Sequence, residues 1–405
     1  MSVAAFLSKN RLRAERGREK RLYQAVQAAA LRPLHALPLT ELCDAHKQVT
    51  VICGQASPVA LAALLDLMRK AGVPHTNINV LVAALPHAPR HLSLAGVPTE
   101  WHCAEHADEL TTLGYLDGIA LDVNMRALEA DLLIALGGRR PNVPTWQPQG
   151  ALAALCPGVT SQAIAAELRM SQQLEAQLAG YPEALAHRLP RELAHRLGLT
   201  FAVEVVEGAL PIVFAGSPDT VDQAAAHEVA MQRELRVAHP QYDRLVIQAG
   251  ASDLFDVVPL IAHLVLHRDT VLIKGAPIII EAAMPILAGE RETFCSTLAM
   301  DADPGLLLHW LARRPLREEG LVRAWAWSKV RLSHPLIAVC TPPDEPRARA
   351  LGMVPAFTLN EAHEIADSLA GQGLVLELNS TDWVNPVYAP ADAPDEEWES
   401  VLNDW

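Results

Sequence analysis

The stretch QVTVICGQASPVALAALLDLMRKA, residues 48–71, contains the unit from which the fold of this chain is predicted. Residues 48–54 are rich in β-branched and apolar side chains, a composition typical of a buried strand. Residues 58–71 have the composition of a helix, and Pro58 stands in the first turn, where a proline is tolerated. A strand that leads through a short loop into a helix is the repeating unit of α/β folds.

Strand-like and helix-like segments alternate along most of the chain. Further strands are predicted at residues 76–84, 131–137, 199–206, 211–215, 243–249, 270–280, 335–341 and 374–379, and further helices at 160–179 and 254–268. The two segments at 199–206 and 211–215 form either a hairpin or two adjacent strands. This alternation favours an α/β fold of two domains, each a mostly parallel sheet flanked by helices, with a cleft between them.

The stretch VAHPQYD interrupts the alternation near residues 236–242 and marks the expected domain boundary. We therefore expect an N-terminal α/β domain at residues 1–238 and a C-terminal α/β domain at residues 239–390. Residues 391–405 are an acidic tail. A cleft between two α/β domains is a common place for a small-molecule site.

The charge balance excludes two classes of partner. The formal net charge is −14, whereas nucleic acids and membrane surfaces are bound by basic fields. The basic segment 9–21, KNRLRAERGREKR, is predicted to be a solvated helix face, and its charge is opposite to that of the acidic end. The apolar patch Val3–Leu7 is too short for the core of a signal peptide, so we expect a cytoplasmic protein.

The six cysteines are scattered and form no CxxC pair, which argues against a zinc ribbon or a redox motif. The stretch WHCAEH brings His102, Cys103 and His106 close together. Histidines four residues apart can bind a metal on a helix, but this segment is predicted to begin as a strand. A chance cluster is therefore favoured, and no metal ligands are predicted.

The stretch GALAALCPGV, residues 150–159, is predicted to be a loop that lets a ligand approach the backbone closely. Its small residues and Pro157-Gly158 favour such a loop. It contains no lysine, histidine or acid.

From about residue 30 to residue 388 the chain resembles the nickel-pincer lactate racemase family. The resemblance rests on the order and spacing of several stretches rather than on any single one. These stretches are LPLTELCDAHKQVTVICGQASPVA, LVAALPHAP, EADLLIALG followed by ALCPGV, YDRLVIQAGASD, TVLIKGAPIIIEA and ALGMVPAFTLNEAHEIAD.

The resemblance implies inversion of a 2-hydroxy acid by hydride transfer to a nickel-bearing pyridinium pincer held covalently by a lysine. An alcohol that loses hydride must also lose a proton, and a histidine is a suitable base near neutral pH. A substrate carboxylate is best held by an arginine fork. Nickel accepts an imidazole ligand.

Matched position by position, most of the family's functional residues are replaced. In the first loop Gly54 stands in place of an aspartate and Ser57 in place of an arginine. The histidine after the second strand matches His87. The other positions fall on Asn142 for the second catalytic histidine, Ala153 for the cofactor lysine, about Glu167 or Leu168 for the nickel-binding histidine, and Leu260 and His263 for a glutamine and a lysine.

The missing lysine is the strongest departure from the family pattern. The lysines of this chain are Lys9, Lys20, Lys47, Lys70, Lys274 and Lys329. None lies between residues 71 and 273, so no small shift of the alignment places a lysine at Ala153. We therefore expect no cofactor.

Six residues are the candidates for a remaining site. His87 is the candidate catalytic residue, and its alternative is an inert hydrogen-bonded histidine at a strand end. Arg139 and Arg140 follow two glycines at a predicted strand end, where open α/β sheets bind ligands, so they are the candidate carboxylate clamp. The alternative for both is a pair of solvated loop arginines.

The other candidate substrate-binding residues are Ser57, Asn142 and His263. His263 lies in the apolar stretch VVPLIAHLVLH, where a core or interface histidine is the alternative.

Three functions remain open. The first is a catalytically silent relative that binds a small carboxylate or hydroxy acid in the cleft, or acts as a regulatory or structural subunit. The second is an enzyme with changed chemistry, such as an epimerase or lyase on a hydroxy acid, that needs no pincer. The third is an active nickel-pincer racemase, against which the missing lysine weighs. The sequence does not indicate an oligomeric state.

Overall fold

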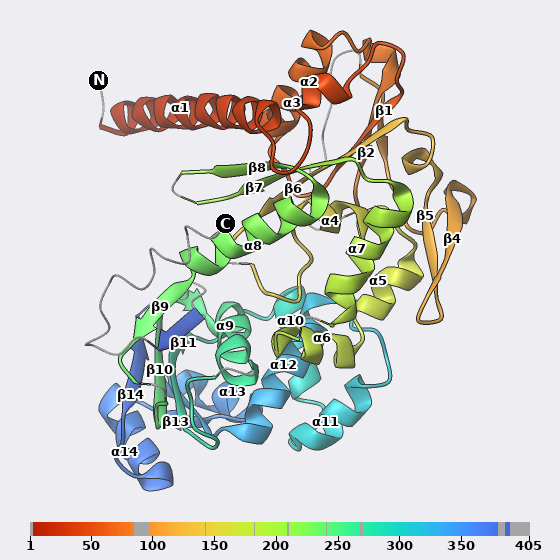
Figure 1. Ribbon diagram of the computed structural model, residues 1–405. Coiled ribbons are helices and arrows are strands. Elements are labelled where there is room, and N and C mark those ends of the chain that lie inside the picture. Colours follow the sequence, from red (N-terminus) through yellow and green to blue (C-terminus); the bar gives the residue numbers. More distant parts are fainter. Residues whose placement is uncertain are drawn as a thin grey trace. The chain divides into compact units, whose positions relative to one another are not determined.

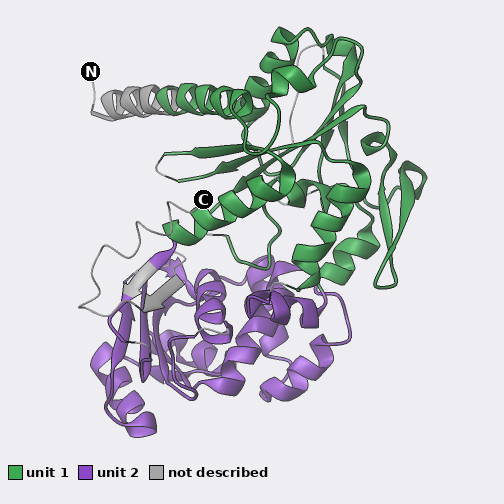
Figure 2. Ribbon diagram, in the orientation of Figure 1, with its two compact units in different colours: residues 1–169, 182–232 green, residues 170–181, 233–405 purple. Residues whose placement is uncertain are grey.

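The computed structural model describes residues 3–84, 97–141, 143–181, 183–208, 210–239, 241–267, 270–379 and 385–388 (Figure 1). The chain forms two compact units: unit 1 comprises residues 1–169 and 182–232, and unit 2 comprises residues 170–181 and 233–405 (Figure 2). The sequence-based division at residue 238 treats each domain as one continuous stretch, whereas residues 170–181 lie with unit 2. No helix of the described residues is long and apolar enough to cross a membrane.

Unit 1 is built on a six-stranded sheet with the order β3-β2-β1-β6-β7-β8. Every neighbouring pair is parallel except β7 and β8, which form an antiparallel hairpin. Each residue of β1 is buried, as expected for a strand with helices on both faces of its sheet. The strands are β1 Val49–Cys53, β2 Ile78–Val82, β3 Thr99–Trp101, β6 Leu132–Arg139, β7 Phe201–Val206 and β8 Ile212–Gly216.

The helices of unit 1 pack their apolar faces on this sheet. In α3 the buried residues include Leu61, Leu64 and Met68, at the three- and four-residue spacing of one helix face. The helices are α1 Val3–Leu31, α2 Leu39–Leu42, α3 Pro58–Lys70, α4 Gly150–Leu155, α5 Gln162–Leu168, α7 Leu185–Leu197 and α8 Pro218–Gln232. Short 3-10 turns lie at η1 His75–Asn77, η2 Ala107–Glu109 and η3 Met125–Ala127.

A separate two-stranded hairpin, β4 Leu110–Leu116 and β5 Ile119–Asn124, extends from unit 1. Asp117 and Gly118 connect the strands with φ angles of 51° and 84°. Two left-handed residues in a two-residue loop are the turn geometry that matches the twist of a hairpin, and Asp-Gly favours it.

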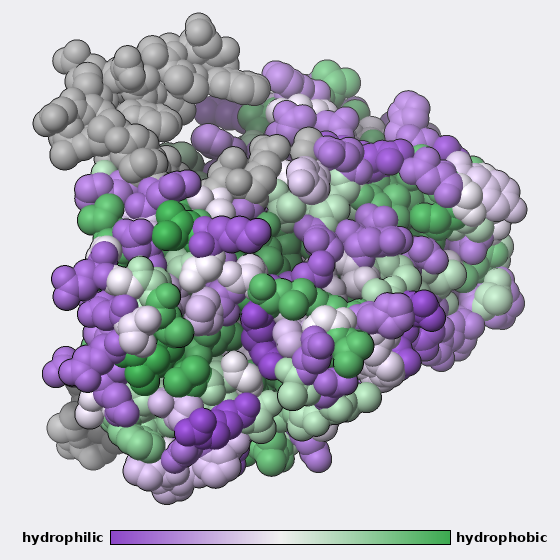
Figure 3. All heavy atoms as spheres, turned by 90° about the horizontal axis from the view of Figure 1, so that it is seen from below, coloured by the Kyte–Doolittle hydropathy of each residue, from purple (hydrophilic) through white to green (hydrophobic). Residues whose placement is uncertain are grey.

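Unit 2 contains a five-stranded parallel sheet with the order β13-β12-β11-β10-β14. Its strands are β10 Arg244–Asp253, β11 Ile278–Ala283, β12 Leu336–Val339, β13 Val354–Ala356 and β14 Val375–Leu378, and β9 Glu234–Val237 pairs separately with β15 Asn385–Tyr388. Its helices are α6 Ser171–Leu178, α9 Leu254–Leu266, α10 Glu290–Leu298, α11 Pro304–Leu311, α12 Glu319–Ser333, α13 Glu345–Ala350 and α14 Leu359–Ala370, with the 3-10 turn η4 Pro342–Asp344. Hydrophilic and hydrophobic residues lie intermingled on the face seen in Figure 3.

The predicted α/β class with two mostly parallel sheets is confirmed, but one predicted helix and one predicted strand are wrong. The helix predicted at 160–179 is two helices, α5 and α6, which belong to different units. Of the strand predicted at 270–280, only the end from Ile278 is extended. Gly275 has a φ of 84°, a left-handed conformation that interrupts a strand.

Two consecutive glycines, Gly137 and Gly138, allow the backbone at the end of β6 to pack directly against the backbone of neighbouring segments. A Cβ atom on Gly137 would lie 2.1 Å from the carbonyl carbon of Gly150, and one on Gly138 would lie 2.1 Å from the carbonyl oxygen of Gln55. Both contacts are with backbone, which cannot rotate away. These glycines therefore hold the start of α4 and the loop after β1 against the carboxyl end of β6.

We predict that Gly137→Ala lowers the free energy of unfolding by roughly 3 kcal/mol, because the added methyl group overpacks a fixed backbone contact. Gly17→Ala is the matched control, since nothing lies within 4 Å of a Cβ atom at that helical position. Urea denaturation of both variants measures the effect. Equal stability of Gly137→Ala and the parent chain would contradict the close packing.

Candidate functional site at the carboxyl edge of the first sheet

The strand order of unit 1 creates a switch point beside β1, where the connections on its two sides lead to different strands. β1 lies between β2 and β6, and the chain leaves β1 toward β2 and reaches β6 only later. In open α/β sheets, ligands bind beside the carboxyl ends of the strands at such a switch point. The loop 54–57 after β1 and the residues that follow β6 therefore define the candidate site.

Loop 54–57 ends in a helix cap. The Ser57 hydroxyl accepts a hydrogen bond from the Val59 amide at 3.2 Å and starts α3, with Pro58 as its first residue. Ser57 thus has a structural role at the position where the resemblance places an arginine. Ser57 was predicted as a substrate contact, and the second lone pair of its hydroxyl oxygen can accept a hydrogen bond from a substrate.

Gln55, in the same loop, was not singled out from the sequence. Its side chain is 5% exposed, and its Nε2 donates to the carbonyl oxygen of Pro148 at 3.3 Å. That contact fixes the amide orientation, because a carbonyl oxygen accepts only. Its Oε1 is buried and has no hydrogen-bond partner among the described residues. A buried acceptor without a partner is costly, so Gln55 is a candidate ligand contact.

Arg139 belongs to a charge network, and its side chain is only 17% exposed. Its Nε donates to Glu204 on β7, and its Nη2 donates to Asp222 on α8. Asp222 also pairs with Arg191 of α7 at 3.1 Å. From the sequence, Arg139 was expected to be either a substrate clamp or a solvated loop arginine. Neither expectation included an ion pair with Glu204 or Asp222. Both carboxylates were missed from the sequence because they lie more than sixty residues away along the chain.

Glu204 is completely buried within this network. Burial raises the pKa of its carboxyl group, and the nearby Arg139 guanidinium opposes that shift. Burial disfavours the charge on Arg139 as well, but the Glu204 and Asp222 carboxylates outweigh it and raise the pKa of the guanidinium. Burial disfavours the charge on each of the two side chains, and the opposite charge of the partner offsets that cost.

The stretch 150–159 is not the predicted loop, because residues 150–155 form helix α4. The run Ala-Leu-Ala-Ala-Leu has high helix propensity, and Pro157 prevents continuation. The Glu204 carboxylate accepts a hydrogen bond from the Ala151 amide at 3.1 Å at the start of this helix. Gly150 has a φ of 87°, and a Cβ there would lie 2.6 Å from a Glu204 oxygen.

Ala153, the position matched to the cofactor lysine, lies in the middle of α4 and is 4% exposed. It belongs to the hydrophobic core of unit 1, together with Leu152 and Leu155. An alanine methyl group supplies neither an amine nor an exposed attachment point. The residues present at this position therefore do not fit a covalent pincer.

Arg140 points to a second, half-exposed set of partners. Its backbone amide donates to Gln149 at 2.7 Å, and its Nε donates to Glu207 at 3.0 Å. His87 and Asn142 lie outside the described residues, and His263 is buried in α9 of unit 2, with its ring centroid 5.5 Å from that of His267.

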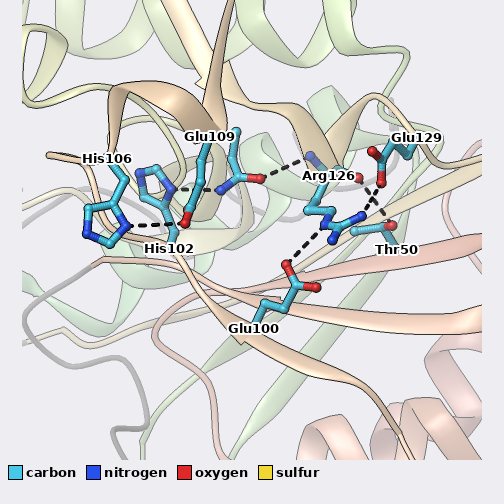
Figure 4. Close-up of polar contacts among 8 residues, drawn as sticks. Thr50, Glu100, His102, His106, Glu109, Arg126 and Glu129 are labelled. Atoms are coloured by element: carbon cyan, nitrogen blue, oxygen red, sulfur yellow. Dashed lines mark hydrogen bonds and ion pairs between the residues drawn. The ribbon is translucent and has the colours of Figure 1, made fainter.

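The WHCAEH stretch forms part of a polar cluster beside the sheet (Figure 4). His102 is buried, and its Nε2 lies 2.9 Å from the Thr160 carbonyl, so this nitrogen must carry the proton. Its Nδ1 accepts from Asn124 at 3.2 Å. Asn124 also accepts from the Arg126 amide, and the Arg126 side chain pairs with Glu100 at 3.1 Å.

Both ring nitrogens of His102 are thus occupied, and burial lowers the pKa of the imidazole, which is held neutral. His106 is exposed instead and contacts Glu109 at 3.2 Å (Figure 4). In the part of the chain that the structure describes, no group of three or more His, Cys, Asp or Glu side chains is placed to hold a metal ion.

Comparisons with known proteins agree with this architecture. Residues 7–143 match the family model described as the lactate racemase N-terminal domain. The fold is similar to that of the lactate racemase apoprotein from Thermoanaerobacterium thermosaccharolyticum, at 21% identity and a TM-score of 0.70, covering 90% of this chain and 93% of that one. No curated protein matches the sequence.

A protein from Thermotoga maritima shares the fold more distantly, at 13% identity and a TM-score of 0.53, covering 91% of this chain and 98% of that one. The N-terminal part is a lactate racemase domain on a two-unit α/β fold. The family model and the shared fold both agree with the resemblance predicted from the sequence.

We predict that Glu204→Gln lowers the free energy of unfolding by about 3–5 kcal/mol, because it leaves the buried Arg139 charge without one of its partners. Glu207→Gln is the matched control: its ion pair with Arg140 is about 40% exposed, and we expect a change below about 1 kcal/mol. Chemical denaturation compares the two. Similar small effects at both positions would show that the buried network contributes little.

We also predict a pH dependence from His102. Because its folded-state pKa is lowered below 6.5, its contribution to stability is complete above that pH and is lost as the pH falls. His102→Gln should therefore lose less stability between about pH 7 and pH 5 than the parent chain. His106→Gln is the exposed control and should follow the parent. Parallel curves for His102→Gln and the parent would contradict the prediction.

Proposed function

We propose that this lactate racemase family member carries no covalent nickel pincer and binds a small 2-hydroxy acid without racemising it. The observation that carries the proposal is Ala153, a core residue of helix α4 at the position of the cofactor-bearing lysine. The nearest lysines in the sequence are Lys70 and Lys274, more than eighty residues away on either side. Without an amine at this position, the covalent thioamide link has no attachment point.

Catalytic silence is also supported by the state of the polar groups. The Arg139 guanidinium is neutralised by Glu204 and Asp222, so it does not offer the free cation that a catalytic carboxylate clamp needs. His102 is tied at both nitrogens, and a general base must reach the proton it removes. His87, the one predicted catalytic residue, lies outside the described residues.

Ligand binding is supported by what the carboxyl edge of the sheet retains. The unpartnered Oε1 of Gln55 is an acceptor suited to the hydroxyl of a hydroxy acid, and Ser57 lies two residues away. An acceptor matched to a hydroxyl discriminates strongly against an analogue that lacks it. The ligand is therefore expected to be a hydroxy acid rather than a simple carboxylate.

We predict that the chain stays unmodified when it is produced together with the enzymes that make the pincer. Intact mass spectrometry should give the mass of the sequence alone, and metal analysis should find no stoichiometric nickel. An active lactate racemase produced in the same cells serves as the positive control. A stoichiometric adduct with nickel would overturn the proposal and favour an active racemase.

Binding is checked by thermal shift with lactate and with propionate, its analogue without the hydroxyl. A ligand that binds the native state raises the melting temperature, and we expect lactate to raise it more than propionate. Gln55→Met should remove the difference between the two acids. Conversion of one lactate enantiomer into the other, followed by chiral chromatography, would instead identify an enzyme.

A further inference from the structure

The hairpin β4–β5 is held beside helix α7 by arginine side chains of that helix. Arg196 donates to two backbone carbonyl oxygens of β4, at 3.4 Å and 3.3 Å. Its Nε also pairs with Glu192, one turn earlier on α7, at 2.6 Å. At the tip of the hairpin, Asp117 pairs with Arg188 at 3.0 Å. The hairpin is therefore tied to α7 at two points, and both elements belong to unit 1.

A cavity of about 300 Å³ lies between the hairpin and the helix. Among the described residues, its walls are formed by Leu116, Arg188, Arg191 and Glu192. The volume is at the lower end of the range for small-molecule sites, so the cavity admits a small ligand. The charge of Glu192 is already offset by Arg196. The lining therefore combines two guanidinium groups with one apolar side chain.

Both guanidinium groups keep most of their hydrogen-bonding capacity. Each has five N–H donors. Among the described residues, the only ion pair of Arg188 is with Asp117, through Nη2. The only ion pair of Arg191 there is with Asp222, also through Nη2, at 3.1 Å. The Arg188 and Arg191 side chains are 46% and 45% exposed, so a ligand can reach their other donors.

Neither of these ion pairs prevents a ligand from binding. Asp117 is 56% exposed, so water solvates its carboxylate when Arg188 turns to a ligand, and exposed ion pairs contribute little to stability. Asp222 is only 15% exposed, but it keeps Arg139 as a partner when Arg191 turns away. Both arginines can therefore bind an anion at a small cost.

Two guanidinium groups on one helix face are suited to a dianion. Arg188 and Arg191 are three residues apart on α7, and such residues are neighbours on the surface of a helix. A single guanidinium already satisfies a carboxylate through two parallel hydrogen bonds. A phosphate group has three acceptor oxygens and a charge of about −1.5 to −2 near neutral pH, which is enough for both arginines. Leu116 provides an apolar contact for a short carbon chain.

We propose that this cavity binds a small phosphate monoester. The phosphate group lies between Arg188 and Arg191, and the carbon chain contacts Leu116. The phosphate competes with the Asp117 carboxylate for Arg188. This inference does not rest on the hydroxy acid proposed for the carboxyl edge of the sheet.

Isothermal titration calorimetry of the full-length chain with glycerol 3-phosphate tests the proposal. R188Q/R191Q should weaken binding at least about tenfold, because it removes hydrogen bonds from charged donors. D117N should tighten binding about twofold to fivefold, because it removes a carboxylate that competes for Arg188. R126Q is the matched control: Arg126 is 51% exposed and pairs with two acids elsewhere in unit 1, and its loss should leave the affinity unchanged.

Four results would overturn the proposal. The first is the absence of binding by the parent chain at millimolar glycerol 3-phosphate. The second is equal weakening in R126Q, which would indicate a general effect of charge. The third is unchanged affinity in D117N, and since misfolding does not tighten binding, this variant tests the site even if the double variant is unstable. The fourth is binding of propionate as tight as that of glycerol 3-phosphate, which would exclude a site built for a dianion.

Discussion

The buried ion pair between Arg139 and Glu204 is the interaction on which unit 1 depends. It joins β6 to β7, and through Asp222 and the Ala151 amide it extends to α8 and α4. Taking two charges out of water is expensive, so the pair is tolerated only because each group is met by several partners. The carboxyl edge of the sheet is therefore organised around a charge balance rather than around an open cationic site.

The same balance occupies the place where the resemblance expects the cofactor-bearing lysine. A covalent pincer requires a reactive amine in an accessible loop, whereas here the corresponding residues are a short helix inside the core. Glu204 accepts the hydrogen bond of an amide at the start of this helix, and Gly150 leaves room for the carboxylate. The Glu204 carboxylate thus fixes the start of helix α4.

The sequence predicts the sheets well and the polar contacts poorly. Runs rich in β-branched and apolar residues, such as 48–54, are local signals, and so β1 and the helix that follows it are recognisable from composition. Arg139 was singled out correctly as a residue at a strand end, but its partners come from β7 and α8, and no local pattern connects them. Gln55 was missed for a similar reason, since its importance lies in burial and an unused acceptor. The 160–179 segment was read as one helix because spacing alone carries no information about the unit in which each half packs.

The excursion of residues 170–181 into unit 2 has a consequence for the order in which the molecule folds. During synthesis, β6 emerges before β7, yet Arg139 stays without its buried carboxylate until Glu204 has been made. By then α6 has already been synthesised, and the unit in which it packs begins again only at residue 233. Unit 1 is therefore complete only after part of unit 2 has been made, and a stretch ending at residue 169 would lack β7, whose Glu204 pairs with Arg139.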